Sequence, residues 1–164
     1  MLKLKKGSIS NIEIAPLGFS SCVLIDITAF KAVKKAQSLL KPEIKLVITR
    51  AYQPESLFIK WARYFGARLF SLIYPARENE AEEIFGHNGH AIDGRHVDIS
   101  IKYKGNLLIL LPNSVFTNLQ KIEKIKQKNS QVIADVRAAL QNTGFSIHHN
   151  ITESLQIHCD LIAH

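Results

Sequence analysis

Residues 86–100, GHNGHAIDGRHVDIS, concentrate more metal-binding side chains than any other part of the chain. The stretch holds three histidines and two aspartates between glycines, and it runs into a β-prone segment at Val97. Near the C-terminus, residues 153–164 add a glutamate and two more histidines. We expect the fold to bring these two segments together as one zinc site, and the rest of the chain to be built around it.

Apolar spacing on both sides of this stretch predicts alternating helices and strands. Before it, the pattern indicates short strands in residues 1–25, a helix from Asp26 or Thr28 to about Leu40, a strand over 44–49, a helix from Pro54 to Phe65 that Gly66 stops, and a strand over 68–74. After one helical turn at 80–85, it indicates strands 97–103 and 107–111, helices at 115–125 and from a Ser130 cap, and a last strand over 156–162.

The two strands after the histidine-rich stretch are predicted to form a hairpin across Lys104-Gly105-Asn106, with glycine and asparagine at positive φ. Mixed helices and strands with a hairpin predict an α+β fold, with a mainly antiparallel sheet flanked by helices. The length of 164 residues suits one domain, 1–164, with one core.

The composition bears on membrane insertion, secretion and the state of the cysteines. No apolar run approaches the roughly 20 residues of a membrane helix, so no membrane insertion is expected. A polar segment follows the N-terminal lysines, which predicts no secretory signal and synthesis in the cytoplasm. The two cysteines, Cys22 and Cys159, lie far apart and are expected to be free thiols.

Basic residues outnumber acidic ones, 21 − 14 = +7, so the chain is expected to be attracted to polyanions. Nucleic acid, anionic lipid and anionic cell-wall polymer all qualify. The lysines of residues 121–128 are expected to form a solvated helix face. A nucleic-acid patch is the alternative interpretation, although no aromatic residues are interleaved with these lysines to stack on bases.

The order of motifs resembles that of the zinc D-Ala-D-Ala peptidases. That family includes the vancomycin-resistance-type dipeptidases and carboxypeptidases and the phage L-alanyl-D-glutamate endolysins, and it shares a fold with the hedgehog signalling domain. The resemblance covers about residues 28–162 and rests on LVITRAYQP at 46–54, GRHVDI at 94–99, Gly144-Phe145 and IHCD at 157–160. His96 stands where the family has a small residue.

The resemblance implies a zinc site made of His90, Asp98 and His158. In the family's spacing the first histidine would stand at Ala91, so His90 comes one residue early, and an extra loop residue could absorb the shift. His87 is the other candidate for the first ligand.

The resemblance also implies catalytic and substrate-binding residues. The family's catalytic carboxylate would stand at Leu155, which leaves Glu153 as the nearest acid. The arginine that stabilises the oxyanion would stand at Gln53, with Arg50 as a possible substitute. Asp160 shares a strand face with His158 by alternation, so it either orients a ligand or is solvated.

Zinc held by two imidazoles and a carboxylate keeps a fourth position for water. The metal activates that water and the scissile carbonyl, and a nearby carboxylate takes up the proton. The resemblance thus implies a Zn²⁺ metallopeptidase that hydrolyses peptide bonds of cell-wall peptidoglycan, as a carboxypeptidase or an endopeptidase. Positive charge would favour its residence on an anionic wall polymer.

Two other functions stay open. A member of the same fold that has lost catalysis would serve as a structural or binding protein, for example in a phage particle, with Asp98 capping a turn and His158 as an interior histidine. A basic nucleic-acid-binding protein would leave the histidine and aspartate cluster unexplained. In every case His148 and His149 are expected to be surface or loop residues, and Cys159 to belong to the core.

Overall fold

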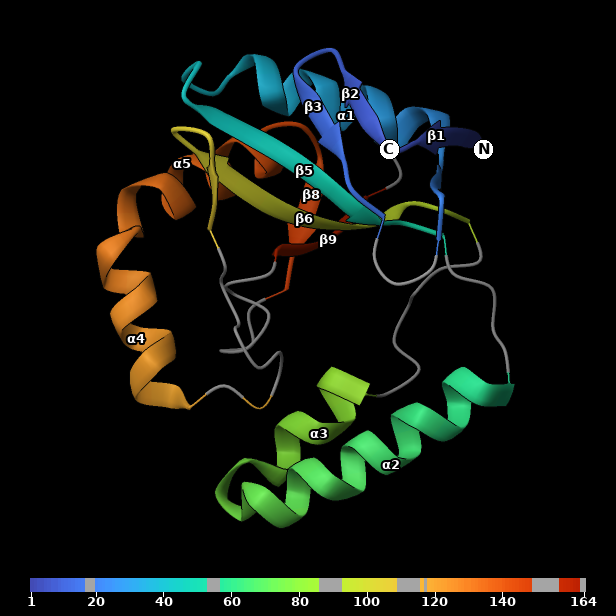
Figure 1. Ribbon diagram of the computed structural model, residues 1–164, viewed down its shortest axis with the longest axis vertical. Coiled ribbons are helices and arrows are strands. Elements are labelled where there is room, and N and C mark those ends of the chain that lie inside the picture. Colours follow the sequence, from blue (N-terminus) through green and yellow to red (C-terminus); the bar gives the residue numbers. More distant parts are fainter. Residues whose placement is uncertain are drawn as a thin grey trace.

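The structure is a computed structural model that describes residues 1–16, 20–52, 57–85, 93–108, 116, 118–148 and 157–162, with 57–60 and 82–83 described by their backbone alone. Its elements (Figure 1) are β1 (Leu2–Lys5), β2 (Gly7–Ile9), β3 (Ile12–Ile14), β4 (Cys22–Ile25), α1 (Ile27–Ser38), β5 (Ile44–Arg50), α2 (Leu57–Ile73), the 3₁₀ turn η1 (Pro75–Arg77), α3 (Glu78–Phe85), β6 (His96–Tyr103), β7 (Asn106–Leu107), α4 (Leu119–Lys128), α5 (Ser130–Gln141), β8 (Phe145–Ile147) and β9 (Ile157–Leu161).

The main sheet has seven strands within the described residues, in the order β2-β3-β5-β6-β9-β8, with β7 paired to β6. Strands β3 and β5 run parallel, and the other pairs of this sheet are antiparallel. Strands β1 and β4 form a separate two-stranded sheet. The expected α+β class is therefore confirmed, and the sheet is mixed, with the parallel pair β3–β5 among antiparallel ones.

One face of the sheet carries the hydrophobic core. Alternate residues of β5 and β6, such as Leu46, Ile48, Val97 and Ile99, are fully buried there. They belong to one cluster with apolar residues of α1 and α5, including Val33, Val136 and Leu140. Helices α2 and α3 lie on the opposite side of the sheet (Figure 1). Along β6 and β9, the side chains that alternate with the core residues therefore point to the face away from the core.

The start of β6 is fixed by its contact with the start of α1. Asp26 caps α1 by accepting hydrogen bonds from the backbone N–H groups of Thr28 and Ala29, at 2.8 and 3.1 Å. The backbone N–H of Asp26 in turn donates to the carbonyl of Gly94, at 3.0 Å. Gly94 has φ +71°, and a Cβ there would stand 2.9 Å from the Asp26 nitrogen. Only glycine fits this approach, which sets the position from which His96 and Asp98 follow.

The predicted strand over 68–74 is wrong, because α2 continues through Gly66 to Ile73. Gly66 does not end the helix but lets α3 approach it, since a Cβ at Gly66 would stand 2.5 Å from the Phe85 ring. Phe70 is fully buried beside Phe85, Tyr74 and Phe116. These ring contacts outweigh the β propensity of the segment.

The predicted hairpin is confirmed with a different turn. Lys104 (φ 50°) and Gly105 (φ 80°) take the positive φ values, as in a two-residue turn, and Asn106 already pairs with Tyr103. The second strand is short, and residues 109–111 of the prediction lie outside the described residues. Ser130 is the first residue of α5 rather than its cap; the N-cap position belongs to Asn129, whose side chain makes no capping hydrogen bond.

Candidate metal centre

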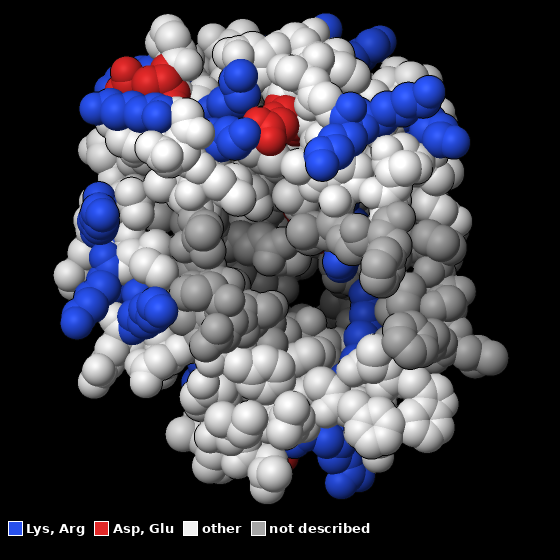
Figure 2. Space-filling model, viewed as in Figure 1, with Lys and Arg blue, Asp and Glu red and all other residues white. Residues whose placement is uncertain are grey.

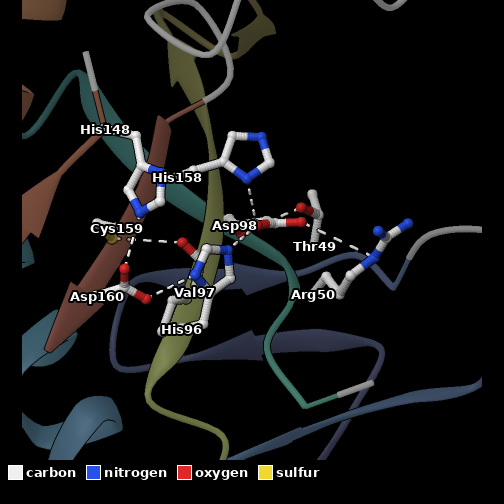
Figure 3. Close-up of polar contacts among 9 residues, drawn as sticks. All are labelled: Thr49, Arg50, His96, Val97, Asp98, His148, His158, Cys159 and Asp160. Atoms are coloured by element: carbon white, nitrogen blue, oxygen red, sulfur yellow. Dashed lines mark hydrogen bonds and ion pairs between the residues drawn. The ribbon is translucent and has the colours of Figure 1, made fainter. Parts of the chain in front are cut away.

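Strands β6 and β9 place two polar pairs directly opposite each other, His96 with Asp160 and Asp98 with His158. Alternation along each strand puts all four side chains on the face away from the core. Between them, Val97 and Cys159 point into the core and are fully buried. The four polar side chains therefore form a compact group, which we call the His/Asp cluster (Figure 3).

Two imidazole rings converge on one carboxylate oxygen of this cluster. Asp98 Oδ1 lies 2.9 Å from His158 Nδ1 and 3.2 Å from His96 Nε2. His96 and Asp98 are each 1 % exposed, and His158 is largely covered. One ligand atom from each of these three residues lies within 4.8 Å of the others, so the group could hold a metal ion.

The second oxygen of Asp98 is buried and makes no hydrogen bond to any described residue. The Arg50 side chain approaches it, with Nε 3.8 Å away. A shift in register between Ile48 and Arg50 brings Arg50 opposite Asp98, and Thr49 donates to the Asp98 backbone carbonyl at 3.1 Å. A buried carboxylate oxygen without a donor is unusual and is satisfied when a cation binds.

The other end of the cluster is more open. Asp160 Oδ1 lies 2.7 Å from His96 Nδ1, and Asp160 Oδ2 lies 2.8 Å from His148 Nε2. His148 follows β8, and its backbone N–H donates to the His158 carbonyl at 3.1 Å. The Asp160 side chain is 43 % exposed and that of His148 is 25 % exposed. These two residues and His96 form a second group with the spacing of metal ligands.

The carboxylates determine the protonation state of the cluster. Burial alone would lower the pKa of His96, but its hydrogen bonds to Asp160 and Asp98 and their charges raise it to about 9. Burial disfavours the Asp98 carboxylate, yet the contacts with His158 and His96 hold its pKa well below the usual range. Burial also raises the pKa of Asp160, but the hydrogen bonds and charges of His96 and His148 lower that pKa below its ordinary value. Without a metal, His96 is therefore an imidazolium between two carboxylates.

The structure brings together some of the residues singled out in the sequence. Asp98 and His158 contact each other, Arg50 lies beside Asp98, and Asp160 lies on the expected face of β9. The expected ligand His90, the expected catalytic Glu153 and the expected substrate contact Gln53 lie outside the described residues.

Sequence reasoning missed His96, a member of the cluster, and His148, which contacts the cluster at Asp160. His96 had no assigned role, yet it connects Asp98 to Asp160; the signal was its position two residues before Asp98, directly ahead of the predicted strand 97–103. His148 was predicted to be a surface or loop residue. It is only partly exposed, because its ring contacts Asp160 and lies edge-on to the His96 ring, 5.7 Å away between ring centres.

No protein-family model, curated protein or solved structure matches the chain. The likeness to zinc D-Ala-D-Ala peptidases and to the hedgehog fold therefore stays a prediction from short motifs. No helix in the described part of the chain is long and apolar enough to cross a membrane.

Proposed function

We propose that the protein is a zinc-dependent peptidase acting on cell-wall peptidoglycan, with His96, Asp98 and His158 as the metal ligands. The observation that carries this proposal is the convergence of two imidazoles on Asp98, whose second oxygen is buried and accepts no hydrogen bond from the residues that the structure describes. In this ligand set His96 takes the part that the motif resemblance gave to His90.

The donor set suits zinc. Two imidazole nitrogens and one carboxylate are a common combination at catalytic zinc sites, which leave a further position for water or substrate. A zinc ion held there would supply Lewis-acid activation of water and of the scissile carbonyl. Calcium and magnesium prefer oxygen ligands, so the two histidines argue against them.

The surrounding residues have separate tasks in this proposal. Asp160 accepts a hydrogen bond from His96 Nδ1–H, which leaves the Nε2 lone pair directed at the Asp98 side. Arg50, 37 % exposed beside Asp98, is positioned to meet negative charge on a substrate. Glu153 stays the sequence-based candidate for the general base.

The substrate class rests on the motif resemblance and on charge. The strand-turn LVITRAYQP and the GRHVDI segment resemble those of enzymes that cut peptide bonds next to D-amino acids. A net charge of +7 favours residence on an anionic wall. Carboxypeptidase and endopeptidase action are both compatible with these features.

The first experiment is the metal content of the purified protein beside His158→Ala and Asp135→Asn. Asp135 is a partly exposed carboxylate on α5, outside the cluster, that accepts a hydrogen bond from Gln131 at 2.7 Å, so its variant controls for a polar substitution elsewhere in the fold. We expect about one zinc per chain in the wild type and in Asp135→Asn, and none in His158→Ala. Cleavage of peptidoglycan fragments, abolished by chelator and restored by zinc, would then establish the reaction. A zinc-free wild type that stays folded in chelator would exclude it.

The cluster also favours a second function, a non-catalytic structural or binding protein. Both ring nitrogens of His96 already contact carboxylates, so the imidazolium and its two partners stabilise the sheet without a metal. In that case wild type and Asp160→Asn would bind no zinc, and neither would cleave peptidoglycan.

A further inference from the structure

A cavity of about 630 Å³ lies between the β6–β7 hairpin and α4, at the end of β6 far from the His/Asp cluster. We call it the lysine groove. Its charged lining residues are Lys104 on the hairpin and Lys121, Lys124 and Lys128 on α4. No aspartate or glutamate is among the described residues that line it. The groove therefore combines a concave shape with charge of a single sign.

The lysines of α4 form a row. Lys121, Lys124 and Lys128 are three and four residues apart, so they share one helix face and span about 10 Å along its axis. The acid of this helix, Glu123, pairs instead with Lys126 at 3.7 Å. Figure 2 shows basic side chains along the α4 side of the molecule, at the left of the view. A row of this kind matches an anion whose charges repeat along a chain.

The uncharged lining helps to select the ligand. Leu107 is 48 % exposed in the groove, and Asn106 and Asn129 supply amide donors at its edge. The Tyr103 ring packs against the core and has the Lys104 ammonium over it, 5.2 Å from the ring centre. Tyr103 is only partly exposed and Lys104 lies over its ring, so the described lining offers little aromatic surface on which a nucleobase could stack.

We propose that the lysine groove binds a linear phosphodiester polymer that carries no bases, of the poly(glycerol phosphate) type. Successive phosphates would contact the lysines of α4 and Lys104, because lysine binds phosphate as a compact point charge. The aliphatic carbons between the phosphates would lie against Leu107. This binding needs neither the metal nor catalysis, so it stands or fails independently of the proposed peptidase activity.

The test is titration of the full-length protein with fluorescently labelled poly(glycerol phosphate) at low and at physiological salt. The groove variant is Lys121→Glu with Lys124→Glu, and the matched control is Lys34→Glu with Lys41→Glu. All four lysines are exposed, the control pair lies outside the groove, and each double variant changes the net charge from +7 to +7 − 4 = +3.

We expect the groove variant to bind about 10- to 100-fold more weakly. The slope of log Kd against the logarithm of the salt concentration should fall by about 1 to 2. The control should change affinity by less than about 3-fold, as expected from long-range charge alone. If the groove variant fails to fold, judged by circular dichroism, Lys124→Gln with Lys128→Gln replaces it.

Three results would overturn the proposal. The first is no binding by the wild type at low salt. The second is an equal loss in the groove and control variants, which would show attraction by net charge alone. The third is equal or tighter binding of single-stranded DNA with the same number of phosphates, which would make a nucleic acid the better ligand. Chelator should leave the binding of poly(glycerol phosphate) unchanged.

Discussion

Asp98 and Asp160 lie on the same face of the sheet and both contact His96, but their surroundings differ. Asp98 is 1 % exposed, with two imidazoles on one oxygen and, in the described part of the chain, no hydrogen bond to the other. Asp160 is 43 % exposed, with one imidazole on each oxygen. The buried carboxylate has unused capacity for a cation, whereas the open one is satisfied by its two histidines. We therefore assign metal binding to the Asp98 end and positioning to the Asp160 end.

Asp98→Asn should have the largest effect of any change in the cluster. It removes a proposed metal ligand and also the buried charge that faces His96 and His158, so we expect loss of bound zinc and a destabilisation of about 3 kcal/mol or more. Zinc analysis and denaturant unfolding measure the two effects, with Asp135→Asn as the control for the same substitution at a carboxylate outside the cluster. If Asp98→Asn retained zinc fully, metal binding would have to be assigned to the Asp160 end of the cluster instead of the Asp98 end.

Asp160→Asn should weaken zinc binding without abolishing it. An asparagine still accepts a hydrogen bond from His96 Nδ1–H but without charge, and loss of such an outer partner typically costs about 10- to 100-fold in metal affinity. Competition with a chromophoric chelator measures the affinity, and the visible spectrum of the cobalt-substituted protein should keep its shape. Two zinc ions per wild-type chain, falling to one in Asp160→Asn, would show instead that Asp160 is a ligand.

The metal-free protein should lose stability as pH rises from about 6.5 to 9. The pKa of His96 is raised in the fold from its ordinary 6.5 to about 9. Its charged form thus stabilises the fold fully below pH 6.5, and that contribution disappears as the pH passes 9. Thermal unfolding in chelator measures this dependence, and His96→Gln should flatten it. A stability that does not change over this range would mean that His96 is neutral in the fold.

The same cluster shows which features of the fold and the site could be predicted from the sequence. Alternation along a strand is local, so the β-rich run before Tyr103 predicted β6, and the alternation of the last predicted strand placed His158 and Asp160 on one face. The register that sets His96 opposite Asp160 joins residues 64 positions apart and depends on the packing of the whole sheet, so no local pattern contains it. Gly66 was wrong as a signal for the end of a helix for the same reason. Its role is set by the Phe85 ring of α3, which packs against it.

His148→Ala should have the smallest effect and would sharpen the comparison most. His148 Nε2 contacts Asp160 Oδ2 and its ring lies edge-on to the His96 ring, whereas His96 is bonded to the other oxygen, Asp160 Oδ1, so the loss of His148 leaves that hydrogen bond in place. Water can replace the missing donor because the Asp160 side chain is 43 % exposed. We expect zinc affinity to fall by less than about 3-fold, well below the effect of Asp160→Asn. An equal loss in the two variants would mean that His148 holds Asp160 in place, and that the positioning of His96 begins at β8 rather than at β9.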